Sequence, residues 1–82
     1  MMTNPIILDT QPIKLFEAEV KSWVCAGNKA YKENVYLICA VIDDCVTFYD
    51  DIGCAHYTTN INQTVYPVPS KVIRKLFNEE EI

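Results

Sequence analysis

Short apolar segments separated by tight turns fill the second half of the chain, and this spacing constrains the fold most. Val35–Ile42 is rich in β-branched and aromatic residues and shows little alternation, which is typical of a central strand with both faces covered. Asp43-Asp44 and Asp50-Asp51-Ile52-Gly53 predict turns, because aspartate bonds its own backbone and glycine accepts a positive φ. The other predicted strands are Cys45–Tyr49, Cys54–Thr59 and Thr64–Val68. Strands joined by such short turns pair antiparallel, so the spacing predicts a small antiparallel β-meander of three to four strands.

The segment of residues 12–25 carries a helical pattern and a competing strand pattern. After a typical helix start at Asp9-Thr10-Gln11-Pro12, apolar side chains recur at helical spacing. These residues are Ile13, Phe16, Val20, Trp23 and Val24. The strand pattern is an alternation of Phe16, Ala18, Val20 and Val24 with Glu17, Glu19 and Lys21. Leucine, alanine, glutamate and lysine dominate the segment, so an N-terminal helix is the preferred prediction and a strand the alternative.

The C-terminal segment predicts a strand end followed by a short helix. Pro67 and Pro69 lack the N–H group that a β-ladder needs, so the last strand is predicted to lie at an edge or to end early. Ser70 is predicted to cap a helix whose apolar side carries Val72, Ile73, Leu76 and Phe77.

Helices at the two ends would cover one face of the meander, which predicts a two-layer α+β fold. The length predicts one domain spanning residues 1–82, with flexible ends at 1–9 and 79–82. Val35–Ile42 is too apolar to lie exposed, so either a helix or a second copy must cover it. A domain this small also gains stability from self-association, and we therefore expect a homodimer.

Acidic residues are concentrated in the middle of the chain. The net charge is −4, and residues 33–70 hold five acidic residues without any lysine or arginine. A patch of one sign creates a directed field that favours a partner of the opposite sign. The predicted partner-binding residues are the four turn aspartates and two strand tyrosines, namely Asp43, Asp44, Asp50, Asp51, Tyr49 and Tyr57. Direct binding of nucleic acid is disfavoured, because a base-stacking platform needs positive charge beside it.

These features favour a small acidic domain that binds a basic groove on a protein partner. An enzyme acting on nucleic acid is the natural candidate partner, and inhibition by steric block or charge mimicry is the natural mechanism. Very small acidic inhibitors of this kind are known from bacteriophages, and the likeness is one of size and charge alone. No sequence motif specifies an activity.

The cysteines and the single histidine carry the alternative hypothesis, a zinc-binding domain. Four cysteines are separated by 13, 5 and 8 residues, so no C-x-x-C pair occurs. Cys54 and His56 would lie on the same face of a strand, and Cys45 with Asp44 or Asp51 could complete four ligands. Because the spacings match no standard ligand pattern, the preferred prediction is free thiols with no metal and no cofactor.

Catalysis, membrane insertion and secretion are all disfavoured by the sequence. Cys54 and His56 could form a thiolate pair, but no glycine-rich loop or nucleophile elbow accompanies them, so the protein is predicted not to be an enzyme. The longest apolar run is Val35–Ile42, far short of the roughly 18 residues of a membrane span. The first residues lack the basic start of a signal peptide, so a cytoplasmic protein is expected.

Overall fold

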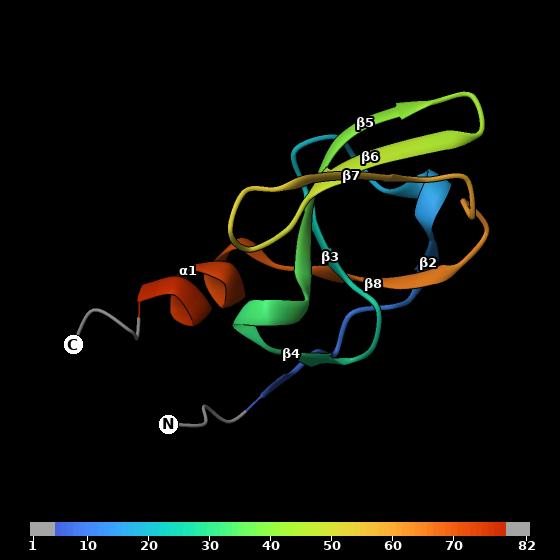
Figure 1. Cartoon of the computed structure of the whole chain (residues 1–82). Coiled ribbons are helices and arrows are strands. Elements are labelled where there is room, and N and C mark those ends of the chain that lie inside the picture. Colours follow the sequence, from blue (N-terminus) through green and yellow to red (C-terminus); the bar gives the residue numbers. More distant parts are fainter. Residues whose placement is uncertain (1–4, 79–82) are drawn as a thin grey trace.

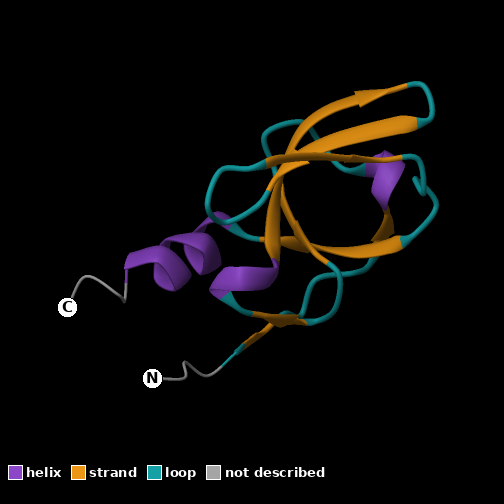
Figure 2. Cartoon of the chain, in the orientation of Figure 1, coloured by secondary structure: helices purple, strands orange, loops and turns teal. Residues whose placement is uncertain are grey.

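Six strands form one antiparallel sheet that curls on itself in the computed structural model, which describes residues 5–78 (Figures 1 and 2). Across the sheet the strands follow the order β2 (Ile13–Lys14), β8 (Thr64–Val68), β3 (Trp23–Cys25), β5 (Val35–Ile42), β6 (Cys45–Tyr49) and β7 (Ala55–Thr58). A separate two-stranded ribbon pairs β1 (Ile6–Ile7) with β4 (Lys29–Ala30). Two 3-10 turns, at Leu15–Glu17 and Lys32–Asn34, and one helix, α1 (Ser70–Asn78), complete the described chain.

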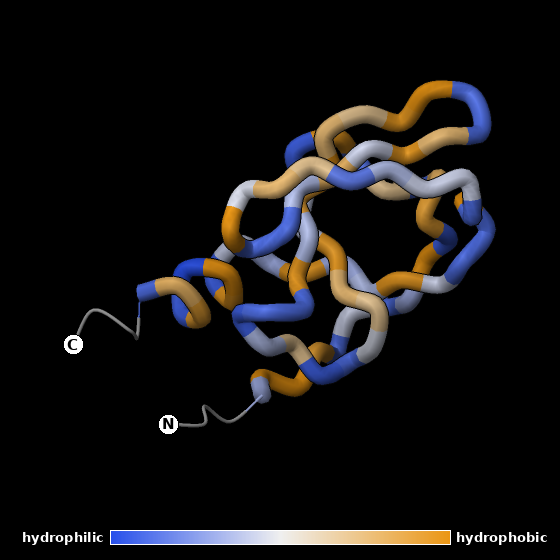
Figure 3. Tube along the Cα trace, viewed as in Figure 1, coloured by the Kyte–Doolittle hydropathy of each residue, from blue (hydrophilic) through white to orange (hydrophobic). Residues whose placement is uncertain are grey.

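The predicted strands of the second half are present, but the α+β class is wrong, because the described chain is mostly β with a single α-helix. Strands β5, β6 and β7 form the predicted meander, joined by the two acidic turns. The C-terminal helix is confirmed and begins at Ser70, where the carbonyl of Pro69 accepts the first helical hydrogen bonds. The trace coloured by hydropathy shows the β5–β6 turn as a hydrophilic tip between apolar strands (Figure 3).

The predicted N-terminal helix is absent, and residues 12–25 instead contribute two strands and a 3-10 turn. Trp23–Cys25 lies between β5 and β8, where both edges of its backbone find antiparallel partners and both Val24 and Cys25 are buried. The apolar set at helical spacing is divided as a result: Phe16 and Val20 are 44% and 51% exposed. Tertiary pairing outweighs the helix propensity of this segment, because propensity differences are small beside the burial of a central strand.

The turn before β3 contains a backbone conformation that the helical prediction missed. Ser22 donates its N–H to the Glu19 carbonyl at 3.1 Å, and Lys21 inside this turn has a φ of 74°. A left-handed conformation costs a residue with a Cβ roughly 1–2 kcal/mol, and glycine avoids this cost.

We therefore expect Lys21→Gly to raise the free energy of unfolding by about 0.5–1 kcal/mol, since part of the gain is offset by the greater freedom of glycine in the unfolded chain. Urea unfolding followed by circular dichroism measures the change. Lys21→Gln is the matched control, because it removes the same charge and keeps the strain. Equal stability of the two variants would show that the turn is unstrained.

The prediction that β8 lies at an edge or ends early is wrong for Thr64 and Val65, which pair with β2, whereas residues 66–68 pair with a strand on one side only, β3. Strand β8 pairs with β3 on one side and with β2 on the other, but β2 reaches only Thr64 and Val65. Beyond β2, the carbonyl of Pro67 accepts a hydrogen bond from the Thr10 hydroxyl at 2.8 Å. In an antiparallel sheet the N–H and the C=O of one residue point to the same side of the strand. The Pro67 carbonyl points away from β3, so the ring nitrogen of Pro67, which carries no hydrogen, points away from β3 as well. The proline therefore costs the β3–β8 ladder no hydrogen bond.

Two apolar clusters pack on the two faces of the curled sheet. The inner cluster holds buried residues from the four strands β3, β5, β6 and β8 and from the segment after β2, namely Leu15, Ala18, Val24, Ile38, Val46 and Val65. The outer cluster is covered by α1 and the β1–β4 ribbon and holds Leu8, Cys25, Ala30, Val35, Val68 and Leu76. Strand β5 contributes Val35 to one cluster and Ile38 to the other, so both faces of its first half are covered as predicted. In its second half, by contrast, Cys39 and Ile42 are exposed.

The predicted flexible ends fall largely outside the described residues, since 1–4 and 79–82 are not described. Within residues 5–9, Ile6–Ile7 pairs with β4 and Leu8 is buried. No helix between residues 5 and 78 is long and apolar enough to cross a membrane.

Candidate functional site

A cavity of about 500 Å³ opens where β6 and β7 meet the first half of β5, next to the inner cluster. Its lining comes from the six sheet strands or the segments beside them: Leu15, Val24, Ala26, Glu33, Tyr36, Ile38, Phe48, Asp50, Asp51, His56, Gln63 and Val65. Four of these are buried aliphatic residues of the inner cluster, which therefore forms the floor of the cavity. This volume lies within the range of about 300–1,000 Å³ found for ligand sites.

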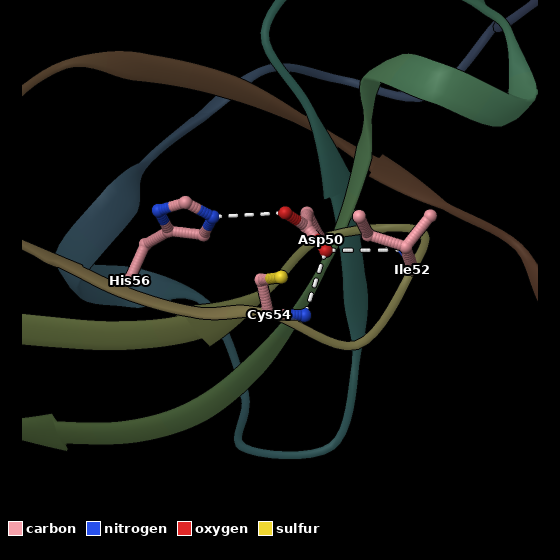
Figure 4. Close-up of polar contacts among 4 residues, drawn as sticks. All are labelled: Asp50, Ile52, Cys54 and His56. Carbon is pink, nitrogen blue, oxygen red and sulfur yellow. Dashed lines mark hydrogen bonds and ion pairs between the residues drawn. The ribbon is translucent and has the colours of Figure 1, made fainter.

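Asp50 and His56 form an interacting pair in the wall of this cavity (Figure 4). Asp50 follows β6 and His56 lies on β7, and their side chains meet with Nε2 of the imidazole 2.9 Å from Oδ2 of the carboxylate. The other carboxylate oxygen accepts two backbone N–H groups, from Cys54 at 2.8 Å and from Ile52 at 3.1 Å. The Asp50 side chain therefore stabilises the conformation of the β6–β7 loop and orients His56.

Three rings stand side by side along the same wall. Phe48 lies opposite His56 in the β6–β7 register, and the two rings stack with their centroids 5.5 Å apart. Tyr36 of β5 meets Phe48 edge-on at 5.3 Å. Both geometries are favourable for aromatic pairs. The three rings therefore hold one another in place.

The charge at the mouth of the cavity is negative. Glu33, Asp50 and Asp51 line it, and no lysine or arginine is among the lining residues. Lys32, the neighbour of Glu33, has its ammonium group 5.6 Å from the ring centre of Phe77 on α1. The hydrogen bond from His56 and the N–H groups of Cys54 and Ile52 lower the pKa of Asp50 below its ordinary value of 3.8.

This pKa shift predicts a pH-dependent contribution of Asp50 to stability. A carboxyl whose pKa is lowered by folding stabilises the native state above its ordinary value, and the contribution disappears as the pH falls through the folded pKa. Asp50→Asn should therefore be less stable than the wild type at pH 5. The difference in the free energy of unfolding between the two proteins should disappear at a pH below the lowered pKa, where the protonated Asp50 and the asparagine are both neutral. Urea midpoints of both proteins across this pH range test the prediction, and a difference independent of pH would contradict it.

The structure separates the predicted partner-binding aspartates into two pairs. Asp50 and Asp51 lie at the cavity, while Asp43 and Asp44 form the β5–β6 turn at the other end of β6. Asp43 has a φ of 52°, which fits its place in a two-residue hairpin turn. Asp50 and Asp51 therefore adjoin the cavity, whereas Asp43 and Asp44 lie in a turn that is distant from it.

The two predicted contact tyrosines lie on the outside of the sheet, away from the cavity. Tyr49 follows Phe48 and Tyr57 follows His56, so by alternation along a strand they point to the opposite face. Tyr57 is 74% exposed. A hydrogen bond with the Cys39 thiol raises the pKa of Tyr49. These tyrosines and the cavity therefore cannot contact the same small group.

The residues of the alternative zinc site are not brought together. Cys54 and His56 lie near the Tyr49 end of β6, whereas Cys45 pairs with Ile42 at the opposite end of that strand. Within residues 5–78 there is no group of three histidine, cysteine or acidic side chains that could hold a metal ion.

The four cysteines are unpaired and differ in exposure. Cys39 and Cys54 are exposed, Cys45 is half-buried and Cys25 is buried, where its thiol donates to the Lys29 carbonyl.

We expect the thiols of Cys39 and Cys54 in the native protein to react rapidly with a maleimide, Cys45 to react more slowly, and Cys25 to react only on unfolding. Mass spectrometry of the timed reaction measures this order. Rapid labelling of Cys25 would mean that the outer cluster opens readily.

Tyr36, Phe48 and Glu33 are site residues that the sequence did not single out. Asp50 follows β6 two residues after Phe48 and lines the same cavity, and the β6–β7 register sets His56 opposite Phe48. The alternation of Phe48 with Asp50, followed by His56 across a short turn, is the only sequence signal for the wall. Glu33 reaches the mouth because residues 32–34 form a 3-10 turn next to β5, and no local pattern indicates this.

No family model, curated protein or solved structure matches this chain. The candidate site therefore rests on its own geometry.

Proposed function

We propose that this protein is a small acidic interaction domain that binds a basic surface of a protein partner in the cytoplasm. The observation that carries the proposal is the cavity mouth, where Glu33, Asp50 and Asp51 stand beside stacked rings and no lysine or arginine lines the opening. Such a mouth attracts a cation and repels an anion, including a phosphate backbone. The natural partner is a nucleic-acid-acting protein with a basic groove, which the domain would block.

Asp50 has a structural task, so it should be left intact when this proposal is tested. Its carboxylate accepts backbone N–H groups from Ile52 and Cys54, and its loss would disturb the loop as well as the charge. Glu33 and Asp51 also line the mouth, and no hydrogen bond of their side chains is described. The informative variant is therefore Glu33→Gln combined with Asp51→Asn. Asp43→Asn combined with Asp44→Asn is the matched control, because it removes the same charge from the distant turn.

The experiment is affinity capture from a lysate of the native host with the wild type and both variants, at two salt concentrations. We expect a basic protein that is retained by the wild type and the turn control, lost by the mouth variant, and released by added salt. Equal retention by all three proteins, or equal loss by both variants, would overturn the assignment of the interaction to the mouth.

The homodimer stays a prediction. Strand β7 is an edge of the sheet and carries the exposed Tyr57, and Ile42 is exposed at the end of β5. Light scattering at micromolar concentration decides between a 9.4 kDa monomer and a species of twice that mass.

A further inference from the structure

The cavity combines an apolar floor with an acidic mouth, and this combination specifies the group that fits it. Leu15, Val24, Ile38 and Val65 form the floor, and none of them is more than 4% exposed. Aliphatic walls of this kind favour a large apolar group, because each square ångström of apolar surface removed from water contributes about 25 cal/mol. A purely charged group would lose its hydration there without finding a partner.

The mouth has the opposite preference. Glu33, Asp50 and Asp51 lie on elements that converge there from the 3-10 turn before β5 and from the β6–β7 loop. Asp50 already has His56 and two backbone N–H groups as partners, but a neutral apolar ligand would cover Glu33 and Asp51 and deprive their carboxylates of water without compensation. A cation placed beside them would compensate for the lost water.

We propose that the cavity takes one large apolar side chain of the partner, and that an adjacent lysine or arginine of the same segment binds the carboxylates at the mouth. This inference rests on the proposed function and names the ligand class of that site: a peptide segment in which an apolar residue is flanked by basic residues. A peptide is the ligand that this proposed function implies, because the partner is a protein.

Nuclear magnetic resonance titration with three blocked pentapeptides tests the two requirements separately. The reference probe is acetyl-Gly-Arg-Phe-Arg-Gly-amide. The second probe has citrulline in place of both arginines, which removes the charge and keeps the shape. The third has glycine in place of phenylalanine, which removes the apolar group and keeps the charge.

We expect the reference peptide to shift the amide signals of residues around the cavity, including Ile38, Phe48 and His56. Each of the other two peptides should bind at least fivefold more weakly. Equal affinity of the citrulline peptide would show that the cavity is merely apolar. Equal affinity of the glycine peptide would show that only the surface charge acts. Either result, or shifts confined to the outer face around Tyr57, would overturn the inference.

Two variants of the exposed β3–β4 turn check that the peptide enters the cavity. Ala26 lines the opening, so Ala26→Phe should obstruct it and weaken the reference peptide at least fivefold. Asn28→Phe places the same ring two residues away at an exposed position that does not line the cavity, and it should leave binding unchanged. Equal effects would contradict the proposed route. If none of the peptides binds, while capture of a partner protein still requires Glu33 and Asp51, this inference is wrong and the proposed function stands.

Discussion

Ile38→Ala is expected to lower the free energy of unfolding by about 2–5 kcal/mol, which is the largest effect of any substitution considered for this protein. Ile38 is 1% exposed and lies in the inner cluster, where it packs among side chains of several strands. Its truncation removes buried apolar contacts and leaves a hole that a curled sheet cannot easily close. Domains of this size have a total stability of only about 4–12 kcal/mol, so part of the variant could be unfolded at room temperature.

Urea unfolding of the wild type, Ile38→Ala and Ile42→Ala measures this effect with its control. Ile42 belongs to the same strand but is 65% exposed, so its truncation should change stability by no more than about 0.5 kcal/mol. Similar losses for the two variants would mean that the inner cluster is not the core of the fold.

Reversal of charge at the cavity mouth is expected to slow association with the partner at least tenfold. Glu33→Lys combined with Asp51→Lys changes the local charge by four units, and steering by complementary charge changes association rates by tenfold or more. Added salt should slow the wild type and speed the reversed variant, since screening weakens attraction and repulsion alike.

Stopped-flow or surface-binding kinetics at two ionic strengths measure these rates with the captured partner. Asp43→Lys combined with Asp44→Lys is the control, because it makes the same change of net charge at the β5–β6 turn. Equal slowing by both variants would assign the effect to the net charge of the molecule, and unchanged rates in both would leave the acidic residues as a solvated surface.

The predictable part of the fold is the part encoded locally. The strands from Val35 to Val68 could be placed because aspartate, glycine and asparagine interrupt runs of β-branched and aromatic residues. The C-terminal helix could be placed because Ser70 begins a segment with apolar residues at helical spacing. In each case neighbours in sequence supply the determining signal.

The unpredicted part depends on residues distant in sequence. Trp23–Cys25 is a strand because β5 and β8 flank it, while the composition of the whole segment 12–25 favours a helix. For the site, the acidic turn at 50–51 was identified correctly as a cluster of charge. The cavity beside it was not, because Glu33, Tyr36 and Val65 meet only once the sheet curls.

The position of β8 has a consequence for the order of events during synthesis. This last strand lies between β2 and β3, the two strands of the sheet made first, so the sheet is completed by its final segment. Pairing of such distant segments closes long loops and is characteristic of slow folding. A nascent chain that ends before Thr64 exposes one edge of β3 and the floor of the cavity. Ribosome-bound chains of increasing length should therefore become resistant to protease only after Val68 has left the exit tunnel.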